Sequence, residues 1–270
     1  MSRVLDRNAP IGVFDSGLGG LTVAHAIMRQ IPGESLVYFG DTARVPYGPK
    51  SPETVRRYCH EIAAFLLEQG VKAIIVACNT ATAHALPMLE AELDVPVIGV
   101  VGPGARAAVR ATKNGHIGVI GTEGTIKSGA YMRAIHAESP AATVTARPCP
   151  LFVPLVEEGW TDHAATRLIA TDYLAPFMSG EVDTLVLGCT HYALLKRVIA
   201  ETIGPAVTLI DSAEETAADT RRMLAEHDLA STESEGNYRF IASDDPQQFL
   251  DLGQRFFGDA LERVEIRTFA

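Results

Sequence analysis

The chain has few cysteines, little positive charge and no long apolar stretch. Only four of its 270 residues are cysteine, and no two form a Cys-x-x-Cys pair, which excludes a disulfide framework and the common zinc motifs. Lysine and arginine number 23 against 33 acidic residues, for a formal net charge of -10. With no basic run, we expect no nucleic-acid partner. No apolar run has signal-peptide character or approaches the roughly 20 residues of a membrane span, so we expect a cytoplasmic protein without membrane contact.

Short apolar runs are present throughout and alternate with helical patterns such as Pro52–Gln69 and Ala164–Phe177. The runs are continuous and do not alternate with polar residues, which is typical of strands in a parallel sheet that is covered on both faces. The chain is therefore expected to be an α/β protein. The predicted strands are Pro10–Phe14, Ser35–Gly40, Ala73–Ala77, Val95–Val100, Ile117–Ile120, Thr143–Arg147, Thr184–Leu187 and Thr208–Ile210.

A weak internal repeat divides the chain. IGVFDSG at Ile11 resembles IGVIGTEG at Ile117, and the segment around Cys78 resembles that around Cys189 at a similar separation. We therefore predict two similar lobes, each a mostly parallel sheet flanked by helices, with the active site in the cleft between them. Residues 1–100 and 210–270 are expected to form the first lobe, and residues 101–209 the second. In the returning tail we expect helices at Ser212–Glu226 and Pro246–Phe257, and strands at Tyr238–Ala242 and Val264–Phe269.

Four polar clusters follow predicted strands directly. Because ligands of parallel sheets bind beyond the carboxyl ends of the strands, these clusters are expected to meet. Their hydroxyl, amide and free N–H donors suit a small anionic ligand. Any one of these residues could instead be a simple helix cap, but four clusters together favour a site. They are Asp15-Ser16-Gly17, Cys78-Asn79-Thr80, Gly121-Thr122 and Gly188-Cys189-Thr190-His191.

Cys78 and Cys189 are the most specific feature of the sequence. Each stands at a predicted strand-to-helix junction, where the helix dipole can lower a thiol pKa from about 8.5 toward neutrality. If the lobes face each other, one thiol lies on each side of the cleft. Two such bases can remove a proton from one face of a carbon and return one to the other, which inverts a stereocentre. Cys59 and Cys149 are expected to be structural.

Three further residues could assist these thiols. His191 lies two residues beyond Cys189, and Asp15 ends the first strand. Either could help proton transfer, although a single His or Asp is more often part of ordinary hydrogen-bonded structure. Glu157 is an acidic residue among apolar neighbours, and its pattern alone suggests only a solvated helix face.

Five segments, in this order, resemble the glutamate racemase family: DSGLGGLTV (Asp15–Val23), YFGDTARVPYG (Tyr38–Gly48), VACNTATA (Val76–Ala83), GVIGTEGTI (Gly118–Ile126) and LGCTHY (Leu187–Tyr192). The resemblance implies interconversion of L- and D-glutamate, supplying D-glutamate for peptidoglycan. It implies glutamate as the small-molecule substrate and no cofactor. From the cysteine spacing we expect no metal. A homodimer is the assembly we consider.

By the same resemblance, Cys78 is similar to the base that deprotonates D-glutamate, and Cys189 to the one that deprotonates L-glutamate. Asp15, His191 and Glu157 resemble the assisting groups. The family's usual Pro after the last motif is replaced by Ala193, which puts the start of the following helix in doubt. Substrate-binding positions implied by the resemblance are Asp15, Ser16, Tyr47, Gly48, Asn79, Thr80, Thr122, Thr190 and His191.

Three alternatives stay open from the sequence. An aspartate racemase would carry the same two cysteine motifs. A non-catalytic two-lobed protein that binds an acidic metabolite would explain the lobes but not the paired thiols. A nicotinamide-dependent oxidoreductase is the least favoured. The G-x-G-x-x-A pattern at Gly102 is weak alone, and Pro103 would reshape its tight turn.

Overall fold

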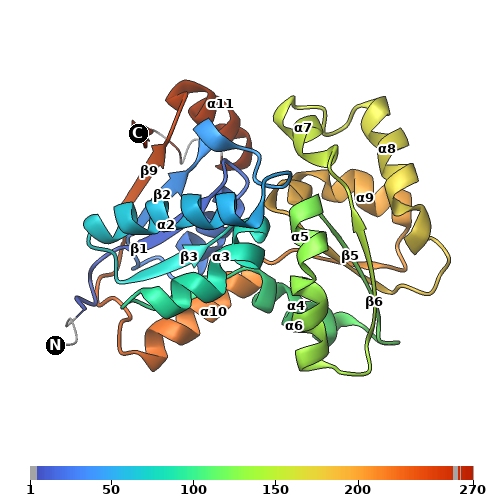
Figure 1. The fold of residues 1–270 in the computed structure, drawn as a ribbon, viewed down its shortest axis with the longest axis horizontal. Coiled ribbons are helices and arrows are strands. Elements are labelled where there is room, and N and C mark those ends of the chain that lie inside the picture. Colours follow the sequence, from blue (N-terminus) through green and yellow to red (C-terminus); the bar gives the residue numbers. More distant parts are fainter. Residues whose placement is uncertain (1–4, 258–260, 262, 270) are drawn as a thin grey trace.

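Two parallel β-sheets form the framework of the chain (Figure 1). The computed structural model describes residues 5–257, 261 and 263–269. The strand order is β10-β9-β2-β1-β3-β4 in the larger sheet and β6-β5-β7-β8 in the smaller one. All strand pairs in the described residues are parallel, which confirms the predicted fold class. The strands are β1 Ile11–Asp15, β2 Leu36–Gly40, β3 Ala73–Val76, β4 Val97–Gly99, β5 His116–Gly121, β6 Thr143–Pro148, β7 Thr184–Gly188, β8 Thr208–Ile210, β9 Tyr238–Ala242 and β10 Glu265–Ile266.

The two sheets repeat one topology. The order β2-β1-β3-β4 in the first sheet recurs as β6-β5-β7-β8 in the second. The two similar IGV segments form β1 and β5, which lie inside their sheets, between β2 and β3 and between β6 and β7. Cys78 and Cys189 follow the equivalent strands β3 and β7. The weak sequence repeat therefore corresponds to two lobes of the same construction.

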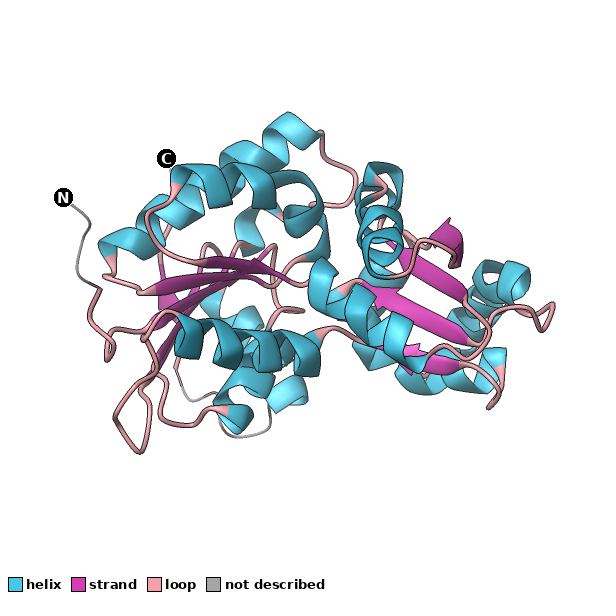
Figure 2. Cartoon of the chain, turned by 90° about the horizontal axis from the view of Figure 1, so that it is seen from below, coloured by secondary structure: helices cyan, strands magenta, loops and turns pink. Residues whose placement is uncertain are grey.

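Helices cover both faces of each sheet (Figure 2). In the described residues, none is long and apolar enough to cross a membrane. Those around the first sheet are α1 Leu21–Gln30, α2 Pro52–Glu68, α3 Asn79–Glu92, α10 Ala213–Glu226 and α11 Pro246–Phe257; the others are α4 Val101–Ala111, α5 Glu123–Ser128, α6 Ala130–Glu138, α7 Phe152–Glu157, α8 Ala164–Leu174 and α9 Lys196–Ile203. Short 3₁₀ helices occur at η1 Thr42–Arg44, η2 Ala175–Phe177 and η3 Thr190–Leu195.

The burial of the central strands explains why their continuous apolar runs could be recognised in the sequence. Every residue of β1, β2, β3 and β7 is buried, because helices pack on both faces of these strands. The edge strand β6 has no buried residue and carries more polar side chains. Local sequence signals also set where helices begin. At the start of α2, the Ser51 hydroxyl accepts a hydrogen bond from the Thr54 N–H, and Pro52 occupies the first helical position.

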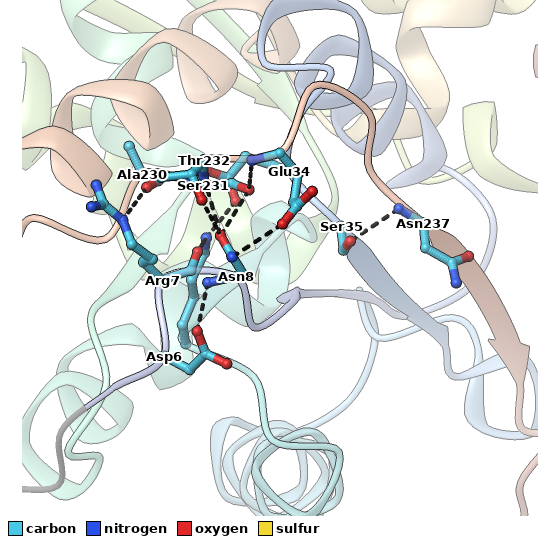
Figure 3. Close-up of polar contacts among 11 residues, drawn as sticks. Asp6, Arg7, Asn8, Glu34, Ser35, Ala230, Ser231, Thr232 and Asn237 are labelled. Atoms are coloured by element: carbon cyan, nitrogen blue, oxygen red, sulfur yellow. Dashed lines mark hydrogen bonds and ion pairs between the residues drawn. The ribbon is translucent and has the colours of Figure 1, made fainter.

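The C-terminal tail returns to the first sheet. After α10, strand β9 pairs with β2, and Asn8 and Ser35 hold the connecting segment through the hydrogen bonds drawn in Figure 3. The predicted strand Val264–Phe269 was too long, since only Glu265–Ile266 pairs with β9 at the sheet edge.

The predicted lobe boundaries need one adjustment. The boundary at residue 209 falls inside β8 Thr208–Ile210, which belongs wholly to the second sheet. The division otherwise follows the distribution of the strands between the sheets, and it stays a prediction. Residues 1–4, 258–260, 262 and 270 of the first lobe lie outside the described residues.

A buried ion pair lies at the base of the first lobe. Lys72 is fully buried, and its Nζ lies 2.5 Å from Oε2 of Glu34, whose side chain is only 5% exposed. The other carboxylate oxygen of Glu34 accepts a hydrogen bond from the Ser231 N–H at 2.7 Å. The pair therefore connects the segment before β3, the segment before β2 and the returning tail.

Replacing Lys72 with methionine is expected to lower the free energy of unfolding by about 3–5 kcal/mol, because the charge of the buried Glu34 carboxylate would lose its cationic partner. Adding Glu34→Gln should restore much of that loss. Denaturant titration measures both. The exposed pair Arg29–Glu214 supplies the control, since Arg29→Ala should cost about 1 kcal/mol or less. Equal losses for Lys72→Met and Arg29→Ala would contradict the role given to the buried pair.

Candidate active site

A small cavity lies between the two lobes, at the carboxyl ends of their strands. Its volume is 20 Å³, about the space needed for one water molecule. All predicted site residues except Asp15 and Glu157 line it. The lining residues are Ser16, Val45, Pro46, Tyr47, Gly48, Cys78, Asn79 and Thr80 from the first lobe, with Thr122, Val153, Cys189, Thr190 and His191 from the second. An amino acid is larger than this space, so we expect the lobes to separate when one enters.

Glycines let the two lobes approach closely around the cavity. A Cβ on Gly19 would lie 2.2 Å from Oγ1 of Thr190, and one on Gly48 would lie 2.8 Å from Cβ of Thr122. The Gly124 N–H also donates to the Gly48 carbonyl across the cleft at 3.0 Å. A side chain at Gly19 or Gly48 would therefore push the lobes apart. Gly19 belongs to the DSGLGG segment, so this close approach explains one of its glycines.

Cys78 caps the N-terminus of α3. Its Sγ accepts a hydrogen bond from the Ala81 N–H at 3.4 Å, and its thiol donates to Oγ of Ser16 at 3.7 Å. Burial, followed by the negative charge of Asp15, raises the pKa of Cys78 to about 12, although both hydrogen bonds oppose the shift. The expectation of a near-neutral thiol is therefore wrong for Cys78 in this closed state. Desolvation outweighs the helix N-terminus.

Cys189 has a different environment. It precedes the 3₁₀ helix η3 and not an α-helix, and its Sγ lies 3.9 Å from Nδ1 of His191. Nε2 of His191 lies 3.3 Å from Oε1 of Glu157, the last residue of α7. Burial by itself lowers the pKa of His191, but hydrogen bonds to Cys189 and Glu157 and the charges of Cys189 and Asp15 raise it to about 10. The imidazole is therefore charged at neutral pH and can stabilise a thiolate on Cys189.

Asp15 and Glu157 do not line the small cavity. Asp15 is fully buried, and one carboxylate oxygen accepts a hydrogen bond from the Gly17 N–H at 2.9 Å while the other has no partner. Burial raises the pKa of Asp15, against the charge of His191 and three backbone N–H groups. Glu157 is about one-third exposed and acts on the site through His191. The sequence pattern alone could not have chosen Glu157, because its partner lies 34 positions away on another element.

Polar groups of both lobes surround the remaining wall. The hydroxyls of Thr80, Thr122 and Thr125 form a triangle with separations of 2.8, 3.2 and 3.0 Å. The Asn79 amide nitrogen is buried without a partner. The Tyr47 hydroxyl, by contrast, donates to Asp41. The cavity therefore offers hydroxyl and amide groups that can bind carboxylates.

Some contributors were not predicted. Val45, Pro46 and Val153 form an apolar part of the wall, and Thr125 supports the two threonines. Apolar wall residues carry no signal that separates them from core residues in a sequence.

Cys59 and Cys149 are buried free thiols outside the cavity, as expected for structural cysteines. Among the described residues, no group of three or more His, Cys, Asp or Glu side chains is placed to hold a metal ion.

Comparisons with known proteins agree with this geometry. The family model for Asp/Glu/hydantoin racemases matches residues 11–220. Glutamate racemase from Geobacter metallireducens is 56% identical over 255 residues, with 94% of each chain covered. A crystal structure of a glutamate racemase isoform from Bacillus anthracis is similar with a TM-score of 0.93 at 41% identity, covering 98% of both chains. Glutamate racemase from Francisella tularensis in complex with D-glutamate has a TM-score of 0.90 at 39% identity, covering 97% of this chain and 98% of that one.

The match extends over nearly the whole chain and includes both lobes, so it is not limited to the two cysteine motifs. The match over nearly the whole chain and the two thiols in one cavity both point to one family. The chain belongs to the glutamate racemase family, within the Asp/Glu/hydantoin racemases.

Proposed function

We propose that this protein interconverts L- and D-glutamate by moving a proton at Cα between two cysteine thiols, without a cofactor. The observation that carries the proposal is the placement of Cys78 and Cys189 in one cavity, at equivalent strand ends of two lobes with the same topology. The similar proteins named glutamate racemase support glutamate as the substrate. A protein that only bound glutamate between its lobes would not need a thiol in each lobe.

In the direction from L to D, Cys189 acts as the base. The charged His191, held by Glu157, stabilises the Cys189 thiolate. The Cα–H bond of L-glutamate breaks, its proton goes to Cys189, and its electron pair stays on the substrate. The neutral Cys78 thiol then gives its proton to the opposite face, which yields D-glutamate and a Cys78 thiolate. The reverse reaction uses the same steps in the opposite order.

Asp15 takes the corresponding assisting role at Cys78. Its negative charge disfavours the Cys78 thiolate, and its own pKa is raised by burial. A proton on Asp15 would therefore relieve the repulsion when Cys78 has lost its own. We assign the substrate carboxylates to the N–H and hydroxyl groups of Ser16, Asn79, Thr80, Thr122 and Thr190, with the Tyr47–Gly48 segment and His191 completing the site.

The biological setting follows from the activity. We propose a cytoplasmic enzyme that supplies D-glutamate for peptidoglycan, and a homodimer as its assembly. Sedimentation of the purified protein tests the assembly. An aspartate racemase stays the second candidate, and comparing both amino acids in one assay separates the two.

Each catalytic thiol can be tested by its own substitution. Cys78→Ala or Cys189→Ala should lower the racemisation rate by about a thousandfold or more, since general acid–base catalysis is lost on one face of Cα. In D2O, Cys78→Ala should still exchange the Cα hydrogen of L-glutamate without inverting it, because Cys189 can only return a deuteron to the face it attacked. Cys189→Ala should do the same with D-glutamate. Proton NMR and polarimetry measure exchange and inversion.

Cys59→Ala is the matched control, because it removes a buried thiol outside the cavity and should keep racemisation. Full racemisation by either cavity variant would refute the two-thiol mechanism. No exchange at all by the folded unmodified protein would refute the proposed function itself.

The pH profile tests the role of Glu157. Hydrogen bonding to Glu157 helps to raise the pKa of His191 to about 10, so its charged form is present below that pH and is lost as pH rises through it. Glu157→Gln removes the negative partner and should move the alkaline limb of kcat/KM for L-glutamate to lower pH, by about one unit. Ionisation of the substrate ammonium affects the unmodified protein and the Glu157→Gln variant equally, so it cancels when their profiles are compared.

Glu158→Gln is the control for this experiment, because Glu158 is the exposed neighbour of Glu157. Its profile should match that of the unmodified protein. An unchanged alkaline limb in Glu157→Gln would show that Glu157 does not act through His191.

A further inference from the structure

Tyr131 joins the two lobes directly beside the cavity. It lies on α6 in the second lobe, is 3% exposed, and its hydroxyl donates to Oδ1 of Asn79 at 2.7 Å. Asn79 is the residue after Cys78 and the first residue of α3 in the first lobe. This hydrogen bond therefore reaches from one lobe to the segment that carries the thiol of the other.

The ring of Tyr131 also contacts the second catalytic segment. A Cβ on Gly188, the residue before Cys189, would lie 3.0 Å from Cε2 of Tyr131. A Cβ on Gly104 in α4 would lie 3.1 Å from the Tyr131 hydroxyl oxygen. The side chain is thus closely enclosed, and its hydroxyl has little freedom to move away from Asn79.

The contact determines which way the Asn79 amide points. Because the Tyr131 hydroxyl occupies Oδ1, the nitrogen of the same amide is directed away from Tyr131. That nitrogen is buried without a partner, in a residue that lines the cavity. A buried N–H group without an acceptor is costly, and a carboxylate oxygen in the cavity would satisfy it.

We propose that Tyr131 is a positioning residue for substrate binding: it fixes the Asn79 amide so that its N–H groups meet a carboxylate of the substrate. The hydroxyl comes from the opposite lobe, so the amide is fixed only while the cleft is closed. Tyr131 thereby couples carboxylate recognition to closure. This inference rests on the proposed function and adds a residue to it.

The test is Tyr131→Phe, which keeps the ring and removes the hydroxyl. KM for glutamate should rise about tenfold, as expected for the loss of one hydrogen bond that acts equally in the ground and transition states, with kcat nearly unchanged. Calorimetric titration with D-glutamate gives the affinity independently of turnover. An unchanged KM and affinity in folded Tyr131→Phe would overturn the proposal.

A double-mutant cycle separates positioning from general stabilisation. In an Asn79→Ala background, Tyr131→Phe should cause no further loss of D-glutamate affinity, because the amide that it positions is absent. If Tyr131→Phe lowered the D-glutamate affinity by the same factor with and without Asn79→Ala, the proposal would be contradicted. Tyr192→Phe is the matched control: it removes a buried hydroxyl that donates to the Cys149 carbonyl at 2.7 Å within the second lobe. It should lower the melting temperature and leave KM unchanged.

The unmodified protein, measured in the same series, separates this inference from the function on which it rests. An unmodified protein without racemase activity would refute the proposed function. An active unmodified protein with an insensitive Tyr131→Phe variant would refute only the role of Tyr131.

Discussion

Close contact between the two lobes is the constraint on which the rest of the site depends. Two thiols can act on opposite faces of one carbon only if both lobes hold them against the same small cavity. Gly19 and Gly48 permit this approach, and the Thr80–Thr122 hydrogen bond stabilises it. The same contact leaves a space of only 20 Å³, which is smaller than an amino acid, so we expect the lobes to separate when the substrate binds or leaves. On this expectation, catalysis and substrate exchange use different arrangements of the same two lobes.

The two halves of the site share a topology but differ in electrostatics. Cys78 lies near the acid Asp15 and is held neutral by burial, whereas Cys189 lies beside the charged His191. In the proposed mechanism one thiol must be ionised and the other neutral at the start of each turnover. The surroundings of the two thiols therefore differ before any substrate binds, with a carboxyl group near Cys78 and an imidazole beside Cys189. A symmetric pair of thiols would lack this difference.

Recognition of an anion by a chain of net charge -10 depends on local groups. The cavity wall provides threonine hydroxyls and the unpartnered amide nitrogen of Asn79. These groups act at hydrogen-bond distance, and the surface charge is screened by salt beyond about 10 Å. The overall acidity therefore does not prevent binding of an acidic substrate.

The sequence alone determined the α/β class, the repeated halves, the strand ends and the two thiols, because continuous apolar runs and strand-to-helix junctions are local properties of the chain. It also identified most of the cavity wall through the resemblance of its motifs. Only the tertiary structure decided that burial raises the pKa of Cys78, that Glu157 contacts His191, and that Tyr131 reaches Asn79 from the other lobe. These properties depend on desolvation and on contacts between distant segments. Desolvation and these contacts arise only when the chain folds. Folding also separates the four cysteines into two thiols outside the cavity, Cys59 and Cys149, and two that line it, Cys78 and Cys189.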